Sequence, residues 1–367
     1  MSGPADTTEN AATFTADSQV AKACKRIVRH IYAQGLKTGA KLPTQAEFRA
    51  TTEFGNATLS AAMRILVEAG VLTRKTGVGT VVADPDARVP KLWTVGLTLS
   101  EELHQTPIYS QLVAFLQAHL QKTDCRFRLY LEPGQDVGAV PFAVFPGLED
   151  DLAAGRLDAV ISPAILDAAS WARALALGVV PVYVGAEETL PCAVLIEQQT
   201  MVRQATELLV RQGCRRLAVA SHEPPRPGFH YYWDGFQEGL AAAGLPVTAG
   251  ESVTCGPVQG TRAGKQIAAT LLDRAPEQRP DGVIIIDDWL AVGLAAAFRE
   301  AGDYAPEMVV QCNQQAPLAF ALPVTRFWVD VEALAVRSVE LARTRLRDAA
   351  QPERVLFVPQ QLADYGI

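Results

Sequence analysis

The chain has 367 residues, of which 49% are hydrophobic and 20% charged, and its formal net charge is −7 at pH 7. This apolar content offsets the entropy cost of ordering the chain, so a mainly disordered or fibrous protein is excluded. The length exceeds what one hydrophobic core ordinarily serves and predicts two or three folding units.

The charge is distributed unevenly along the chain. Residues 22–82 hold ten lysines and arginines against three acidic residues, a net charge of +7. Residues 1–21 contribute −3, which leaves −11 for residues 83–367. A small basic module joined to a large acidic one predicts a polyanion as the partner of the basic module.

The six cysteines are widely scattered, with no pair at metal-ligand or redox spacing, so we expect buried free thiols and no metal site. Residues 1–17 are acidic and rich in Ala and Thr, which predicts a disordered arm and not a secretory signal. No apolar run approaches the length that crosses a bilayer. These features predict a cytoplasmic protein that has no membrane partner and needs no cofactor.

Residues 18–82 begin with the pattern of two helices. Ser18 can cap an amphipathic segment that is basic on its outer side and ends at Gly35. Thr44 and Glu47 have the reciprocal spacing of a capping box, which predicts a second, short helix through about residue 52.

A third helix and a hairpin complete this module. Asn56 or Thr58 can cap the helix, and Gly70 ends it. Two β-prone runs follow, joined by the glycine-containing turn at residues 76–79. The whole of residues 18–82 is therefore predicted to be a winged helix-turn-helix.

Three spaced elements of this module resemble the GntR-type DNA-binding domain. They are Gly39-x-Lys41-Leu42-Pro43-Thr44, then Ala62-Met63-x-x-Leu66-x-x-x-Gly70-Val71-Leu72, then Gly77-x-Gly79-Thr80-Val81-Val82. The resemblance implies that the start of the third helix reads base edges in the major groove of operator DNA, while the wing lies near phosphates. The DNA-binding residues it implies are Lys41, Thr44, Gln45, Asn56, Ala57, Thr58, Ser60, Arg64, Arg74, Lys75 and Gly77.

The third helix departs from the family pattern at two positions. Gly55-Asn56 replaces the usual Ser-Arg, and Ser60 stands at a second common arginine position. Asn56 can pair with adenine in bidentate fashion, and its alternative role is a plain helix cap. The operator sequence is therefore not implied by the resemblance, and a winged helix used for protein contacts is the alternative for the module.

Residues 83–91 are polar and bounded by prolines, which predicts a linker. In residues 92–367, β-prone runs alternate with helical patterns, and such βα units predict parallel sheets covered by helices. The length predicts two lobes that divide near residues 190–195. The predicted strands are 93–99, 127–131, 159–162, 179–184, 217–220, 283–286 and 308–311, and the helices lie near 108–121, 167–177, 200–212, 232–243, 263–273, 289–301 and 331–347.

This region resembles the two-lobed core of LacI-type repressors, which is similar to the type I periplasmic-binding-protein fold. The matching stretches include Gly155-Arg156-Leu157-Asp158-Ala159-Val160-Ile161 and Asp281-Gly282-Val283-Ile284-Ile285-Ile286-Asp287-Asp288. The resemblance implies an effector-binding and dimerisation domain, with a sugar or related metabolite held between the lobes at the carboxyl ends of strands. The ligand-binding residues predicted here are Tyr109, Ser162, Glu197, Arg226, Tyr232, Trp233, Asp288 and Asn313.

The predicted effector site also departs from its family. Tyr232 stands where the family has an effector-binding arginine, so stacking on Tyr231, Tyr232 and Trp233 is expected in place of charge recognition. At least one of these aromatic residues is expected to pack the lobe, because one helix turns only part of its surface to a ligand. For Asp287, a solvated neighbour of the site is favoured over a direct contact.

The predicted protein is a ligand-responsive transcription regulator, a homodimeric repressor with a GntR-like head and a LacI-like body. No nucleophile elbow, phosphate-cradling glycine loop or metal-ligand spacing indicates an enzyme. The alternative is a sugar-binding protein, or a carbohydrate-active enzyme of the binding-protein fold, without a role in DNA regulation.

Overall fold

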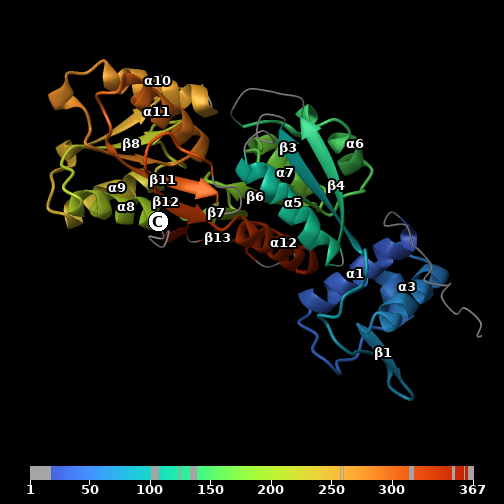
Figure 1. Cartoon of the computed structure of the whole chain (residues 1–367). Helices are drawn as coiled ribbons and strands as arrows, with labels where there is room; N and C mark the ends of the chain where they lie inside the picture. The colour runs from blue at the N-terminus through green and yellow to red at the C-terminus, as the bar shows by residue number, and fades with distance from the viewer. Residues whose placement is uncertain are drawn as a thin grey trace, which may run out of the picture.

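The structure is a computed structural model, and it describes residues 18–100, 107–123, 125–132, 139–256, 258, 260–313, 318–348, 352–358 and 360–362. The predicted arm at residues 1–17 lies outside the described residues. Figure 1 shows a small head, blue, beside the first of two α/β lobes, with the second lobe at the far end.

The head is a winged helix-turn-helix. Its elements are α1 (Gln19–Ala33), α2 (Gln45–Thr51), α3 (Asn56–Glu68), β1 (Leu72–Lys75) and β2 (Gly79–Val82). Ser18 caps α1 by accepting a hydrogen bond from the backbone N of Ala21 (3.2 Å). Thr44 and Glu47 form the predicted capping box at the start of α2. The antiparallel strands β1 and β2 make the wing.

Helix α3 begins at Asn56, one position earlier than it would if Asn56 were its N-cap. Gly55 is the N-cap residue and makes no side-chain bond, and Asn56 is already the first helical residue. The prediction that Asn56 or Thr58 caps this helix is therefore wrong. Gly55 adopts the extended backbone conformation of the N-cap position, so the Asn56 side chain takes no part in capping the helix.

The first lobe is a six-stranded parallel sheet in the order β13-β7-β6-β5-β3-β4. Its strands are β3 (Trp93–Ser100), β4 (Cys125–Glu132), β5 (Ala159–Ser162), β6 (Val180–Gly185), β7 (Ala193–Ile196) and β13 (Val355–Val358). The helices with it are α5 (Pro107–Gln121), α6 (Leu148–Ala153), α7 (Ala168–Ala176) and α12 (Val331–Arg347), with a 3-10 turn η1 (Phe142–Val144).

The second lobe has six strands in the order β14-β12-β11-β10-β8-β9, parallel except for the β12–β14 pair. Its strands are β8 (Leu217–Ser221), β9 (Gly250–Thr254), β10 (Gly282–Ile285), β11 (Glu307–Asn313), β12 (Thr325–Val329) and β14 (Gln360–Leu362). The helices are α8 (Gln199–Arg211), α9 (Tyr231–Ala242), α10 (Gly260–Leu272) and α11 (Asp288–Ala301), with 3-10 turns η2 (Val247–Ala249) and η3 (Pro276–Gln278). These two sheets confirm the predicted α/β fold class.

The chain passes between the lobes three times, whereas the sequence predicted a single division. It leaves the first lobe after β7, returns after β12 through α12 and β13, and enters the second lobe again as β14. The division near residues 190–195 is thus close to the first crossing only. The short strands β13 and β14 find their partners far away along the chain, which local patterns do not reveal.

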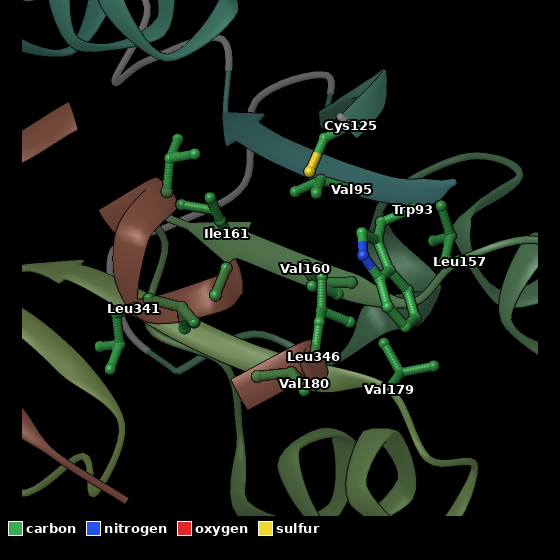
Figure 2. Close-up of a cluster of buried hydrophobic side chains, with 14 of the residues drawn as sticks. Trp93, Val95, Cys125, Leu157, Val160, Ile161, Val179, Val180, Leu341 and Leu346 are labelled. Atoms are coloured by element: carbon green, nitrogen blue, oxygen red, sulfur yellow. The ribbon is translucent and has the colours of Figure 1, made fainter. Parts of the chain in front are cut away.

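The head and the first lobe share one buried apolar cluster. It runs from Ile27 and Leu66 in the head through Trp93 to the interior of the first lobe. Figure 2 shows Trp93 near Leu157 and Val179, at the end of the lobe that faces the head. The second lobe is packed by two separate apolar clusters, so the head belongs structurally to the first lobe.

Candidate DNA-binding face and inter-lobe site

The predicted base-reading residues lie on the exposed start of α3. Asn56, Ala57 and Ser60 are exposed, while Thr58 is half-buried. The opposite side of α3 packs the head through Leu59, Ala62, Met63 and Leu66. The backbone N–H groups of the first turn have no side-chain cap, and the Asn56 side chain beside them is exposed, so both are accessible from outside the head.

The wing presents its two cations beside a glycine turn. Arg74 pairs in register with Thr80, and Lys75 pairs with Gly79. Gly77 and Gly79 have φ of 78° and 106°, a backbone conformation that favours glycine, which explains these residues at the tip. Lys41 forms an isolated bridge with Val81, which brings a third exposed cation to the wing.

Helix α2 is fixed against α3 by Gln45. Ser60 Oγ donates to Gln45 Oε1 (3.3 Å), and Gln45 Nε2 donates to Met63 Sδ (3.6 Å). Thr44 is exposed, and its backbone N and hydroxyl both donate to Glu47, which lowers the pKa of that carboxyl. Arg64 lies on the outer face of α3 in an exposed i,i+4 pair with Glu68 (3.7 Å).

Two of the basic residues of α1 do not face solvent as the pattern predicted. Lys25 is buried and Arg29 half-buried, and both contact the first lobe. The outer side of α1 is therefore partly an interface, because the body covers it. These two cations are not available to DNA.

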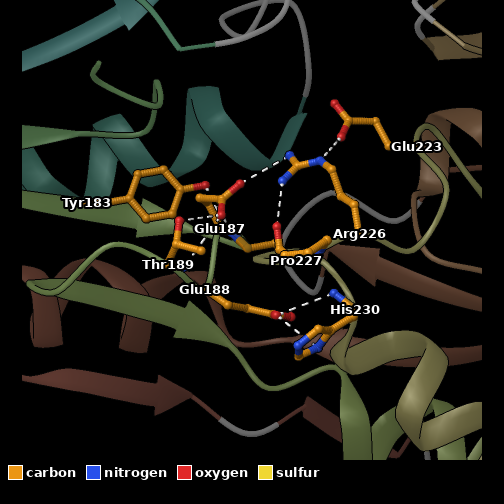
Figure 3. Close-up of polar contacts among 9 residues, drawn as sticks. Tyr183, Glu187, Glu188, Thr189, Glu223, Arg226, Pro227 and His230 are labelled. Carbon is orange, nitrogen blue, oxygen red and sulfur yellow. Dashed lines mark hydrogen bonds and ion pairs between the residues drawn. The ribbon is translucent and has the colours of Figure 1, made fainter. Parts of the chain in front are cut away.

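An ionic network joins the lobes beside the ends of β6 and β8 (Figure 3). Tyr183 Oη accepts hydrogen bonds from the backbone N of Ala186 (3.1 Å) and Glu187 (3.2 Å), which shapes the loop after β6. Glu187 of the first lobe pairs with Arg226 Nη2 of the second lobe (3.1 Å). Arg226 Nε also pairs with Glu223 (2.7 Å), so two carboxylates neutralise this guanidinium.

A second contact of the same loop reaches the start of α9. Glu188 accepts from the backbone N of His230 (3.3 Å) and of Tyr231 (3.0 Å). The Glu188 backbone N donates to the carbonyl of Gly228 (2.8 Å), a residue whose φ of 89° favours glycine. Burial raises the pKa of Glu188, although the two backbone donors act in the opposite direction.

The carboxyl ends of the two sheets also approach each other. Burial and the charge of Asp287 in the second lobe raise the pKa of Tyr109, in the first lobe, to about 12. Asp287 caps α11 by accepting from the backbone N of Leu290 (2.7 Å) and lies 3.6 Å from His222 Nε2. Burial alone would lower the pKa of His222, but Asp287 and Cys255 outweigh it and raise the pKa to about 10.

Three other predicted ligand residues lie inside hydrogen-bond networks. Tyr232 is fully buried in the core of the second lobe, where its hydroxyl donates to the carbonyl of Glu223 (3.0 Å). Ser162 is buried at the end of β5, accepts from Thr98 Oγ1 and donates to the Ala164 carbonyl (both 2.6 Å).

Glu197 accepts from the backbone N of Thr200 (3.1 Å) at the crossing between β7 and α8. Trp233 is half-buried against Phe236, with ring centroids 5.3 Å apart. Asp288 is buried at the start of α11, and Asn313 ends β11. The structure thus brings Tyr109 and Arg226 to the facing surfaces of the lobes and places Tyr232 within a core.

Four residues of this junction were not predicted as ligand contacts: Glu187, Glu188, His222 and His230. Asp288 was predicted because it follows the carboxyl end of a buried strand. Glu187 and Glu188 follow β6 in the same way, so the same rule applied to β6 would have found them. The described residues contain no cluster of three metal-ligating side chains and no helix long and apolar enough to cross a bilayer. All six cysteines are buried, and none is part of a disulfide.

Two family models match the chain. Residues 19–82 match the model for "Bacterial regulatory proteins, gntR family", and residues 206–364 match that for "Periplasmic binding protein-like domain". The head thus matches a GntR-type DNA-binding domain over its full length. Joined to a periplasmic-binding-protein-like domain, it makes the chain a ligand-responsive DNA-binding regulator, which confirms the function class predicted from the sequence.

Solved structures share the fold of this regulator at low identity. A LacI family regulator from Enterococcus faecium with bound ribose is 19% identical and has a TM-score of 0.59; the match covers 74% of this chain and 97% of that one. A CelR regulator–cellobiose complex is 21% identical with a TM-score of 0.59, covering 93% and 98%. A lac repressor dimer bound to operator and an anti-inducer is 16% identical with a TM-score of 0.59, covering 74% and 92%. No curated protein matches the chain.

Proposed function

We propose that this regulator is a homodimeric repressor whose operator affinity changes when a sugar or related small metabolite binds between the lobes. The observation on which the proposal rests is the coexistence of an exposed basic face on the head with a polar junction between the lobes, at opposite ends of the first lobe. As a DNA-binding regulator it is proposed to act in the cytoplasm.

The chemistry of the junction suits a ligand rich in hydroxyl groups. Asp287 accepts hydrogen bonds, His222 and Tyr109 donate them, and all three lie where the sheets face each other. The Nδ1 atom of His222 and the Nε1 atom of Trp289, in the first turn of α11, are buried without a hydrogen-bond partner. A ligand hydroxyl would satisfy such groups, and the ribose and cellobiose of the similar structures support this class.

The effector is proposed to act through the contacts between the lobes. The pairs of Glu187 with Arg226 and of Glu188 with His230 hold the two facing loops together. A ligand that binds better to one lobe arrangement than to the other shifts the equilibrium by its differential affinity, typically about 1–3 kcal/mol. The shift would reach DNA as a change in the separation of two heads.

Dimerisation is proposed to use β4, the edge strand of the first sheet. Leu129 and Leu131 lie on one face of this strand and are 39% and 51% exposed, an unusual state for large apolar residues on an unpaired edge. A second copy of the chain would bury them. The operator-bound lac repressor dimer supports a two-headed assembly on DNA.

Selection of DNA by the protein itself tests the DNA-binding part of the proposal. The full chain is used to recover DNA from a random-sequence library, and the winning site is titrated with and without a panel of monosaccharides, disaccharides and sugar phosphates. We expect a two-fold symmetric site whose affinity one sugar changes by about fivefold or more. Failure to enrich any sequence would refute the assignment.

The sugar found in that panel then tests the inter-lobe site. Asp287→Asn removes the acceptor charge and is expected to abolish the response, while Asp273→Asn, at an exposed position after α10, leaves it intact. The sugar should be recovered unchanged after incubation, because the proposal assigns binding and not turnover. A response that survives Asp287→Asn, or a converted sugar, would contradict the proposed mechanism.

The dimer is tested by charge insertion at the edge strand. Leu131→Glu is expected to convert the protein to monomers in sedimentation analysis and to weaken binding to a two-fold symmetric site. Val247→Glu is the matched control, since Val247 is 52% exposed in the second lobe. A dimer that persists in Leu131→Glu would exclude β4 as the interface.

A further inference from the structure

The head contacts the first lobe through a buried ion pair. Lys25 Nζ of α1 lies 2.6 Å from Asp158 Oδ2, the residue before β5, and both side chains are only 9% exposed. A surface pair contributes little to stability, whereas losing one partner of a buried pair leaves an uncompensated charge. This contact therefore specifies one position of α1 on the lobe.

Asp158 is fixed in place by the lobe itself. Its Oδ2 accepts a hydrogen bond from the backbone N of Thr94 (2.9 Å), and its own backbone N donates to the Thr94 carbonyl (2.8 Å). These contacts, which lie within the lobe, hold the carboxylate at the amino end of two adjacent strands, β3 and β5. The first lobe offers a preformed acceptor to Lys25.

Trp93 and α12 provide the rest of the docking surface. The Trp93 ring lies under two of the cations of α1, with Lys25 Nζ 5.8 Å and the Arg29 guanidinium 5.2 Å from its centroid. Arg29 Nε donates to the carbonyl of Leu346 in the last turn of α12 (3.2 Å), where the helix dipole favours a cation. Three independent contacts thus converge on one face of α1.

The segment that joins head and body is held at the same place. Tyr32 Oη of α1 donates to the Pro85 carbonyl (2.9 Å) or to Asp86 Oδ1 (2.6 Å), and Arg347 pairs with Asp86 (3.6 Å). The Arg347 guanidinium also lies 5.8 Å from the centroid of the Tyr32 ring. The predicted linker is therefore bound between α1 and α12, which removes much of the freedom that its composition suggests.

We infer that the Lys25–Asp158 ion pair docks the head on the first lobe in one orientation and thereby determines the spacing of the operator half-sites. The part that concerns DNA rests on the proposed function. A free nine-residue linker reaches up to about 30 Å, so tethered heads would accept several half-site spacings. Docked heads on a dimer have one separation, and they accept one spacing. Lys25 and Asp158 then determine specificity while lying away from the predicted DNA-binding face.

Hydrogen exchange tests the docking without any DNA. Lys25→Met removes one charge, Asp158→Asn keeps the acceptor for Thr94, and the double variant completes the cycle. We expect faster exchange in α1 and in residues 93–97 for each single variant. The factor by which the double variant speeds exchange should be smaller than the product of the two single-variant factors. Exchange in the second lobe reports that the protein is folded.

Lys22→Met is the matched control, since Lys22 lies three residues earlier on the same helix and is exposed. It is expected to exchange like the native chain. If Lys25→Met behaves like Lys22→Met, or if the two single effects multiply without coupling, the docking by this ion pair is refuted. Neither result depends on the chain binding DNA.

A library of operator half-sites separated by spacers of different length tests the consequence. The native chain and Lys22→Met are expected to select one spacing, and Lys25→Met a broad range, with affinity for a single half-site unchanged within about twofold. An equally narrow choice by Lys25→Met, despite faster exchange in α1, would overturn the link between docking and spacing. Absence of any DNA selection by the native chain would count against the proposed function instead.

Discussion

The charged residues of the proposed DNA-binding face are exposed to solvent, whereas those between the parts of the protein lie against carboxylates. Lys41, Arg74 and Lys75 are exposed, and no acidic side chain in the described part of the chain pairs with them. Lys25 and Arg226, in contrast, each contact carboxylates from another part of the protein. Exposed cations without partners are available to an external polyanion, whereas paired ones hold the protein's own parts together. Four experiments test this contrast.

The largest effect is expected at the junction of the lobes. Glu187→Ala removes a buried carboxylate that joins the lobes through Arg226, and we expect it to lower the free energy of unfolding by about 2–3 kcal/mol. Glu223→Ala is the control, because Glu223 pairs with the same arginine but is far more exposed, so it should lose less than about 1 kcal/mol. Denaturant unfolding measures both, and equal losses would contradict the role given to burial.

The wing should show the converse behaviour. Arg74→Ala with Lys75→Ala is expected to leave the free energy of unfolding within about 0.5 kcal/mol of the native value, since both side chains are exposed. The slope of operator affinity against salt should fall by about two, one for each lost phosphate contact. Arg211 is an exposed cation of the second lobe, and Arg211→Ala should change neither the free energy of unfolding nor the salt slope. An unchanged salt slope would remove the wing from the DNA-binding face.

His222 makes the junction sensitive to pH. Its pKa is about 10 in the folded protein and about 6.5 in an unfolded chain, so its contribution to stability is complete below about pH 6.5 and is lost as the pH rises toward 10. We expect the free energy of unfolding to fall steadily between pH 7 and 10, measured by denaturant unfolding. His222→Gln should flatten this part of the profile. A native profile that rises over the same range would disprove the pairing with Asp287.

The smallest effect is expected for the exposed pair on α3. Glu68→Ala removes the partner of Arg64, and because both side chains are largely exposed the free energy of unfolding should change by less than about 0.5 kcal/mol. Operator affinity should be unchanged or slightly higher, since one acid near the DNA is lost. A large loss of stability would show that exposure is a poor guide to the strength of these pairs.

Local patterns were sufficient for most elements of the fold. The cap at Ser18, the capping box at Thr44 and the alternation of strands and helices in the body all depend on residues within one or two turns of each other. The cap of α3 was predicted wrongly because Gly55 takes the position from Asn56 without any side-chain bond. Strands β7, β9, β12, β13 and β14 are absent from the predicted set. For β13 and β14 the reason is that a short strand is defined by its distant partner.

The inter-lobe site was harder to predict than the fold. Because Asp288 follows a buried strand, it was predicted as a ligand contact. In the structure its neighbour Asp287 caps α11 and lies beside His222. Which of the two adjacent aspartates does so depends on the direction of the backbone. Arg226 was predicted as a ligand contact, and it lies at the junction with two carboxylates as its neighbours. Its role toward an effector stays a prediction.

The sequence by itself determined the winged helix, the α/β body and the division into a basic head and an acidic remainder, because these follow from short-range periodicity, turn chemistry and composition. Only the tertiary structure decided which charged side chains form ion pairs within the protein and which stay exposed. Lys22 and Lys25 are three residues apart on one helix and look alike in the sequence, yet one is exposed and the other is buried against Asp158. The difference arises because the neighbour that covers Lys25 is 133 residues away along the chain.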